Sequence, residues 1–236
     1  MRGIILAAGR GVRMGKLTNG KPKCLIKYKG KRLLEHQIDC FRRSNINDIA
    51  IVTGYKREML SRFKLKEFNN PKWEETNMVS SLLCANEYLE NYHCIVSYSD
   101  ILYSHNAIKM LMNLKHDIAI TYDPNWLSMW SKRFEDPLVD AETFKIDKST
   151  NLIFEIGKKP NKVSEIQGQY MGLIYIKPRG WIKLKKVVHT LEKSHVKNLS
   201  MTELLQIGIS NNLIFLYGCP YYEEWAEFDS ITDLNF

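Results

Sequence analysis

Two glycines and two cations follow the first apolar segment of this 236-residue chain. The segment reads Leu6-Ala7-Ala8-Gly9-Arg10-Gly11-Val12-Arg13-Met14. Because glycine has no side chain, the backbone N–H groups of such a loop can approach a phosphate closely. Arg13 and Lys23 add cations that can reach the same anion. The residue types therefore favour a phosphate site.

The spacing of this loop fits neither of the common phosphate-binding patterns. Met14 stands where the dinucleotide-binding fingerprint has its last glycine, and Leu17 follows Lys16, where a P-loop has Ser or Thr. A glycine-rich turn after a strand is also an ordinary structural feature. The glycines by themselves leave both interpretations open.

Alternating apolar segments and helical patterns predict the elements that hold the loop. Strands are predicted at 3–8, 48–53, 94–98 and 117–122, and helices at 33–43, 78–89 and 107–114. This order predicts an α/β fold with a Rossmann-like, mostly parallel, doubly wound sheet. Ligands of such sheets bind beyond the carboxyl ends of the strands, which is where the loop begins.

The pattern changes after Tyr122. Residues 123–138 are rich in aromatic residues and proline, strands are predicted at 141–156 and 169–176, and helices at 181–194 and 202–209. We expect a small inserted lid that packs on the first half and forms one wall of a cleft. The chain is thus predicted to be a single domain, 1–236, with a core at 1–122 and a lid and C-terminal part at 123–236.

The composition excludes collagen, disordered chains and disulfide scaffolds. Hydrophobic residues make up 44% and charged residues 25% of the chain, which are ordinary globular values. No apolar segment approaches the ~20 residues of a membrane-spanning helix, so we expect no membrane insertion. The five cysteines are odd in number and lack C-x-x-C spacing, which predicts a reducing, cytoplasmic location and argues against a zinc site.

The net charge of +8 favours anionic partners, whether nucleic acid, a membrane surface or small phosphates. A solvated basic surface explains the charge equally well. Because the lysines are dispersed and form no long basic block, we expect no nucleic-acid partner.

A longer string is more specific than the glycines alone. Leu6-Ala7-Ala8-Gly9-x-Gly11-x-Arg13-Met14, followed by Thr18 and by Lys21-Pro22-Lys23-Cys24-Leu25, resembles the signature of the nucleoside-triphosphate transferase family. These enzymes make nucleotide-activated sugars and alcohols. The resemblance implies that the loop wraps a triphosphate and that Arg13 and Lys23 act as phosphate-binding catalytic residues. It also implies that an acceptor phosphate attacks the α-phosphorus and that pyrophosphate leaves.

The same resemblance gives a set of candidate nucleotide-binding residues. They are Leu6, Ala7, Ala8, Gly9, Gly11, Arg13, Lys23, Gly54, Asn77 and Ser80. The glycines and small residues suit backbone contacts to the base and ribose. For Asn77 and Ser80, helix capping is the competing explanation.

Two aspartates are the candidate metal ligands. Asp100 follows a predicted buried strand, and carboxylate oxygens are what Mg2+ prefers. Family members carry a metal-binding Asp at this place, and Asp229 resembles a second one near the end of the chain. We therefore expect Mg2+ as the cofactor, with Glu227 beside the site. The competing interpretation of Asp100 is a turn or a helix cap.

Two departures place the sequence near one branch of the family. Ser99 precedes the first aspartate where sugar-1-phosphate transferases usually have glycine, and Gly157-Lys158-Lys159-Pro160 replaces their Glu-Lys-Pro. The sequence looks closer to small CTP:phosphocholine cytidylyltransferases. This implies CTP and a small phosphorylated acceptor as partners: an amino-alcohol phosphate, a phosphonate or a phosphorylated amino-acid amide, used for surface polysaccharide or lipid.

Aromatic rings and carboxylates of the second half suit an ammonium group on that acceptor. The candidate acceptor-binding residues are Trp126, Trp130, Asp140, Glu142, Lys158, Gln169, Tyr170 and Trp225. A buried hydrophobic stripe is the competing interpretation for Trp126 and Trp130, and a solvated turn is the one for Lys158.

Two other functions stay open at this stage. One is a sugar-1-phosphate nucleotidyltransferase that makes an NDP-sugar, and the other is a non-catalytic nucleotide- or nucleic-acid-binding module. We expect a monomer or a homodimer in either case.

Overall fold

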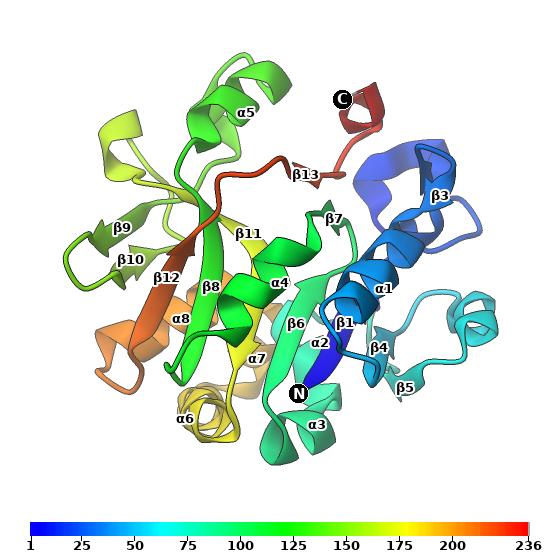
Figure 1. The fold of residues 1–236 in the computed structure, drawn as a ribbon, viewed down its shortest axis with the longest axis horizontal. Coiled ribbons are helices and arrows are strands. Elements are labelled where there is room, and N and C mark those ends of the chain that lie inside the picture. The colour runs from blue at the N-terminus through cyan, green and yellow to red at the C-terminus, as the bar shows by residue number, and fades with distance from the viewer. Residues whose placement is uncertain (236) are drawn as a thin grey trace.

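A nine-stranded sheet forms the centre of the molecule in the computed structural model, which describes residues 1–235 (Figure 1). In spatial order the strands are β5 (Lys66–Asn69), β4 (Ile49–Thr53), β1 (Arg2–Ala7), β6 (Cys94–Tyr98), β11 (Gln169–Ile176), β8 (Ile118–Asp123), β12 (Leu216–Pro220), β10 (Leu152–Ile156) and β9 (Phe144–Asp147). Only β11 and β10 run opposite to the other described strands of this sheet. The predicted α/β fold with a mostly parallel sheet is confirmed.

Helices cover both faces of the sheet. They are α1 (Leu33–Arg43), α2 (Met78–Cys84), α3 (Asn86–Asn91), α4 (His105–Met112), α5 (Trp126–Arg133), α6 (Pro178–His189), α7 (Lys193–Asn198) and α8 (Met201–Ser210). Figure 1 shows α1 and α4 in front of the sheet and α2 and α8 behind it. Short 3-10 helices connect the larger elements: η1 (Val12–Thr18), η2 (Lys23–Leu25), η3 (Arg57–Phe63), η4 (Pro137–Val139), η5 (Val163–Glu165) and η6 (Ile231–Asn235).

Helix α1 illustrates how the sequence sets this packing. Its apolar residues at 33, 34, 38 and 41 are buried on one side. At its start the Glu35 carboxylate accepts a hydrogen bond from the Arg32 amide at 2.8 Å, which caps the helix. Gly3 of β1 leaves room for the Phe41 ring, since a Cβ at Gly3 would lie 2.9 Å from it. The helix therefore lies close against the first strand.

Several predicted boundaries agree with the structure, and others differ for local reasons. The predicted ranges 33–43, 94–98 and 169–176 are those of α1, β6 and β11. The predicted strand 141–156 is instead the hairpin β9–β10, because the turn between them places Asn151 at a φ of 57°. The predicted helix 78–89 is divided at Ala85 into α2 and α3.

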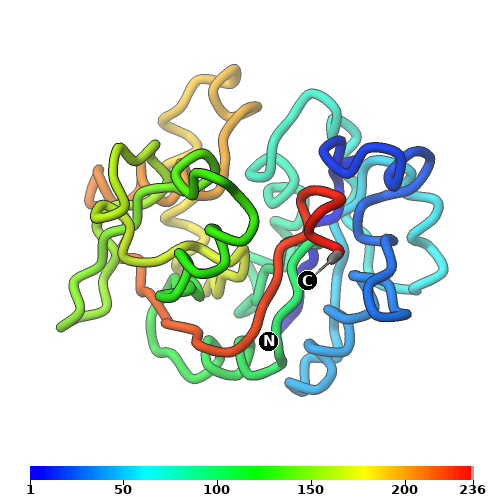
Figure 2. Tube along the Cα trace, turned by 90° about the horizontal axis from the view of Figure 1, so that it is seen from above, coloured from blue at the N-terminus to red at the C-terminus, as the bar shows by residue number. Residues whose placement is uncertain are grey.

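The last described segment lies between the two halves of the molecule. Figures 1 and 2 both show it running between the α5 side and the first strands. It contributes β13 (Ala226–Glu227), which pairs with β7 (Ile101–Leu102). A second small sheet joins β2 (Lys27–Tyr28) to β3 (Lys31–Arg32).

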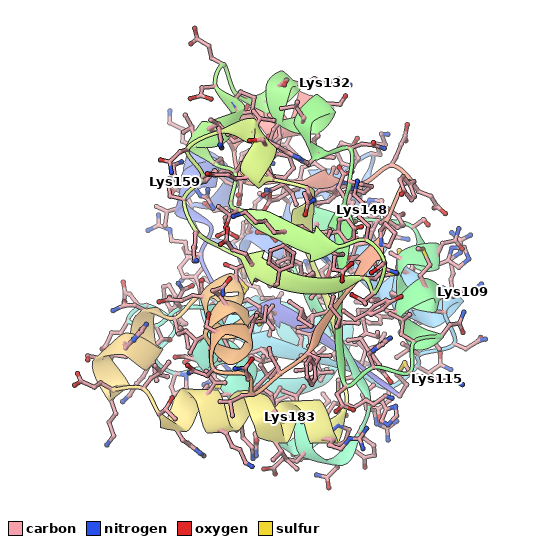
Figure 3. All side chains as sticks on the ribbon, turned by 90° about the vertical axis from the view of Figure 1, so that its left-hand side faces the viewer. Lys109, Lys115, Lys132, Lys148, Lys159 and Lys183 are labelled. Atoms are coloured by element: carbon pink, nitrogen blue, oxygen red, sulfur yellow. The ribbon has the colours of Figure 1, made fainter. Side chains whose placement is uncertain are left out.

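Figure 3 labels six of the lysines. The lysines labelled in Figure 3 come from α4, α5, α6 and the intervening loops, and they are spread over that face of the molecule. Within residues 1–235, none of the helices has the length and apolar character that crossing a membrane would require.

Candidate functional site

The glycine loop folds over the side chain of Lys23. Gly11 has a φ of 74°, and a Cβ there would lie 2.7 Å from the Lys23 stem, so only glycine fits without a shift. The buried Thr18 hydroxyl donates to the carbonyl of Gly11 at 3.0 Å and to that of Gly15 at 3.2 Å. These contacts fix the loop and leave Gly9 exposed beyond the end of β1.

The end of the neighbouring strand braces the loop from one side. The Tyr55 amide donates to the Ala8 carbonyl at 2.9 Å. A Cβ at Gly54 would lie 2.7 Å from that same carbonyl oxygen, so a side chain is excluded there. The ends of β1 and β4 thus approach each other at the edge where Leu6, Ala7 and Ala8 are buried.

Both candidate metal ligands meet at one buried ammonium. Lys23 Nζ lies 2.6 Å from Asp100 Oδ2 and 2.5 Å from Asp229 Oδ1. Arg13 Nη2 lies 3.0 Å from Asp229 Oδ2, and its Nη1 lies 3.9 Å from Asp140. The structure therefore brings together the two predicted cations and the two predicted acids from four separate parts of the sequence.

Sheet geometry explains this meeting. Asp100 follows β6, which lies beside β1 in register, Leu6 opposite Tyr98. Phe228 donates its amide to the Asp100 carbonyl at 2.9 Å, which places Asp229 next to Asp100. The buried rings and chains of a small cluster, Met14, Ile26, Leu33 and Phe228, also hold the glycine loop against this segment.

The charges of the site perturb one another strongly. Burial by itself would lower the pKa of Lys23, but the Asp100 and Asp229 carboxylates outweigh it and the pKa is raised. Burial would raise the pKa of Asp229, yet Lys23 and Arg13 lower it. Burial, with repulsion from Asp229 and Asp100, raises the pKa of Glu227. These three pKa shifts all arise because several charged groups lie close together in one largely buried site.

The donor set suits a hard divalent cation. Within residues 1–235, no group of three or more His, Cys, Asp or Glu side chains is arranged to hold a metal ion. Two carboxylates facing one position already occupied by a cationic group fit Mg2+, which keeps several waters and takes few protein ligands. A zinc site would need a larger set of protein ligands.

Two residues that contact the Asp229 segment, Asp233 and Arg133, are not among the predicted site residues. The buried Asp233 carboxylate accepts the Asp229 amide at 2.9 Å, and Arg133 Nε donates to Asp233 at 3.0 Å. Arg133 Nη1 also donates to Glu227 at 3.1 Å. No sequence pattern near Arg133 indicates this role, since its partners lie about a hundred positions away.

Among the predicted acceptor-binding residues, Glu142 is held by several hydrogen bonds. The buried Gln169 side chain donates to the Glu142 carbonyl at 2.6 Å and accepts the Glu142 amide at 3.3 Å. Thr202 donates to the Glu142 carboxylate at 3.2 Å. Burial, together with the nearby Asp140, raises the pKa of Glu142. No basic side chain in the described part of the chain forms an ion pair with it under 4.0 Å.

The predicted aromatic residues are part of the core. Trp126 and Trp130 are both 3% exposed, and their ring centroids lie 6.1 Å apart. Trp225 is buried against Trp130 and donates its indole N–H to Asp123 at 2.9 Å. The burial of Trp126 and Trp130 agrees with the competing interpretation, in which their helical spacing serves packing. Tyr170, the fourth predicted aromatic residue, is half-buried, and its ring packs edge-on against that of Tyr98 with the ring centroids 5.7 Å apart.

Three further candidates lie on structural contacts. Asn77 caps α2 by accepting the Met78 amide at 2.8 Å, and its side-chain amide donates to Asn198 at 3.0 Å. Ser80 donates to the Val196 carbonyl at 3.4 Å. Lys158 pairs with Glu155 at 3.2 Å and has an exposed side chain, as in a solvated turn. The side chains of Asn77, Ser80 and Lys158 therefore bind partners other than Lys23, Arg13, Asp100 and Asp229.

Comparison with known proteins identifies the family of this chain and several relatives. Residues 3–143, more than half of the chain, match the family model described as MobA-like NTP transferase domain. CTP:phosphoglutamine cytidylyltransferase of Campylobacter jejuni is 35% identical over 100% of this chain and 98% of its own length. Choline-phosphate cytidylyltransferase of Streptococcus pneumoniae is 37% identical over 40% of this chain and 43% of its own.

A solved structure shares the fold over nearly the whole chain. CTP:phosphocholine cytidylyltransferase from Streptococcus pneumoniae superimposes with a TM-score of 0.72 at 21% identity, covering 99% of this chain and 96% of the other. At that identity the likeness shows the fold. Together with the family match and the full-length relative, it shows that this chain belongs to the MobA-like NTP transferase domain family.

Proposed function

We propose that this chain is a Mg2+-dependent cytidylyltransferase that transfers CMP from CTP to a small phosphorylated acceptor. The observation that carries the proposal is the meeting of Lys23, Arg13, Asp100 and Asp229 at the glycine loop. The full-length similarity to a cytidylyltransferase supports CTP as the donor. The proposal places the enzyme in the cytoplasm, in the supply of activated groups for surface polysaccharide or lipid.

The geometry supports transfer by positioning and charge. An oxygen of the acceptor phosphate attacks the α-phosphorus, a new P–O bond forms, the α–β bridging bond breaks, and pyrophosphate leaves with its electrons. The loop amides and Gly11 hold the phosphates, and Arg13 and Lys23 neutralise the charge that develops on them. When bound, the metal adds positive charge at the phosphate oxygens, and Asp100 and Asp229 are the residues that would hold it.

The acceptor chemistry is proposed from Glu142. An acid with a raised pKa, whose backbone is held by Gln169 and whose carboxylate accepts from Thr202 and lacks a basic partner among the described residues, suits a cationic or N–H-rich group from a ligand. Asp140 is nearby but already faces Arg13. A phosphorylated molecule that also carries an amine or an amide fits this arrangement.

A nucleotide panel tests the donor. We expect pyrophosphate release with CTP, and much slower release with UTP, dTTP, GTP or ATP, when phosphorylated amino acids, amino-alcohols and sugar 1-phosphates are offered in turn. CTP should also raise the melting temperature most. Release with UTP, dTTP or GTP and a sugar 1-phosphate would favour an NDP-sugar enzyme. No release with any pairing would reject both enzymes.

Glu142→Gln is expected to raise the KM of an amine-bearing phosphorylated acceptor by about tenfold or more. A hydrogen bond to a charged group contributes ~1.5–3 kcal/mol, and the substitution removes that charge while keeping the size. The KM for CTP should stay unchanged. Glu155→Gln is the matched control, because Glu155 pairs with Lys145 and Lys158 on the hairpin surface. An equal change for an acceptor without nitrogen would contradict the assignment.

A further inference from the structure

Asp233 fixes the backbone that carries Asp229. One oxygen of its carboxylate accepts the amide of Asp229 at 2.9 Å, the amide of Ser230 at 2.7 Å and the hydroxyl of Ser230 at 3.0 Å. The Asp233 side chain is 2% exposed. These three hydrogen bonds fix the backbone at Asp229 and Ser230, and therefore the direction of the Asp229 side chain.

Arg133 in turn fixes Asp233. It is the last residue of α5, and its side chain is 3% exposed. Its Nε donates to the second Asp233 oxygen at 3.0 Å, while its Nη1 donates to Glu227 at 3.1 Å. The guanidinium lies 5.3 Å from the Trp130 ring centroid and 5.2 Å from that of Phe134. The guanidinium is therefore held in a fixed orientation. It binds Glu227, which precedes Asp229 in the sequence, and Asp233, which follows it.

The segment around Asp229 belongs to both halves of the molecule. Glu227 lies in β13, which pairs with β7 on the Asp100 side. Arg133 reaches the same segment from α5 in the second half, and Figures 1 and 2 show the last described residues lying between the two. Asp229 is thus held from both halves, by the Phe228 hydrogen bond to Asp100 and by Arg133 of α5 through Asp233.

We propose that Arg133 and Asp233 are positioning residues, which set Asp229 beside Asp100 and link helix α5 to the metal site. Partners behind a metal ligand commonly set its orientation and affinity. The inference rests on the proposed function for the metal role of Asp229. Through one guanidinium, helix α5 thereby controls a carboxylate that lies beside Arg13 and Lys23 of the first half.

The test measures Mn2+ affinity, by electron paramagnetic resonance of the free ion, with and without CTP, together with kcat. Arg133→Met and Asp233→Ala should each lower Mn2+ affinity about 10- to 100-fold. Arg133→Lys should fall between these and the wild type, since lysine restores the charge but lacks the planar fork that spans both acids. Asp233→Asn should also fall between these and the wild type, because its amide oxygen can still accept the two backbone N–H groups but its NH2 group cannot accept from Arg133.

Arg179→Met is the matched control. Arg179 pairs with Asp117 at 2.8 Å at the start of α6, so the variant removes one guanidinium from a carboxylate elsewhere in the fold. It should bind Mn2+ like the wild type. A thermal unfolding scan of each variant separates loss of positioning from loss of the fold.

Mn2+ affinity of the variants tests the positioning role of Arg133 and Asp233, and pyrophosphate release tests the proposed function. Wild-type Mn2+ affinity in folded Arg133→Met or Asp233→Ala overturns it, and if those variants do not fold, unchanged affinity in Arg133→Lys overturns it instead. If the wild type binds no Mn2+ with or without CTP, the metal role of Asp229 is wrong and the inference fails with it. If Mn2+ binds but no acceptor yields pyrophosphate, only the proposed function fails.

Discussion

Lys23→Met is expected to abolish most catalysis while improving metal binding by the nucleotide-free protein. Removing one preorganised charge from the transition state costs about 10²- to 10³-fold in kcat. The same ammonium lies 2.6 Å from Asp100 and 2.5 Å from Asp229, so it competes with a metal ion for both carboxylates. Methionine keeps the length of the stem beneath Gly11 and removes the charge.

Lys23→Met is also expected to lower the stability of the folded protein. Removing one partner of a buried ion pair costs about 3–5 kcal/mol, because Asp100 and Asp229 are left facing each other. Mn2+ should restore much of that loss, so the melting temperature of Lys23→Met should rise with Mn2+ more than that of the wild type. The measurements are pyrophosphate release, a Mn2+ titration without nucleotide, and a thermal scan.

Lys27→Met is the control for this experiment, because Lys27 is exposed four positions later. It should leave catalysis and Mn2+ affinity unchanged. A Lys23→Met protein that folds but binds Mn2+ no better than the wild type would show that Lys23 and the metal do not share the two acids. Wild-type kcat in that variant would remove Lys23 from the catalytic groups.

The second large effect is expected for Asp229→Asn, with a loss of about 10³-fold in kcat/KM. A metal ion contributes several kcal/mol to such transition states, and each ~1.36 kcal/mol is tenfold in rate. Asparagine keeps the size of the side chain but leaves Asp100 as the one negatively charged ligand of the pair. Asp100→Asn should give a loss of the same order, since both carboxylates face one position.

The fold should survive this substitution, because Lys23 keeps Asp100 as a partner and Asp233 still binds the backbone amide. Asp39→Asn provides the comparison, since Asp39 pairs with Lys31 on the exposed side of α1. Rates are measured at saturating CTP over a range of Mg2+ concentrations. Activity of Asp229→Asn within tenfold of the wild type would exclude Asp229 as a metal ligand.

Short-range patterns carried most of what could be predicted about the site. Small residues at the end of a buried strand, a cation in the same loop and an acid after a neighbouring strand all share one sheet edge, because parallel strands end together. Only the family resemblance predicts Asp229, since nothing near it in the sequence indicates that Phe228 binds the Asp100 carbonyl. Periodicity likewise predicts α1 well, as one face of a helix must be buried.

Other features had no local signal. The helical spacing of Trp126 and Trp130 is the same for a ligand wall and for a core, and only the packing of α5 decides between them. Strand β5 begins with two charged residues, and β12 contains glycine and proline, so neither reads as a strand. Arg133 and Asp233 meet through tertiary structure alone, which no window of sequence contains.

The small cluster that joins Met14 to Phe228 has a consequence for biosynthesis. The amino-terminal loop is packed against residues that a ribosome adds more than two hundred positions later. Since chains fold progressively as they emerge, the first strands can assemble early, whereas the glycine loop acquires its packing partner only when the residues around 228 have left the exit tunnel. A nascent chain that stops short of them would carry the loop without the surface that holds it in shape.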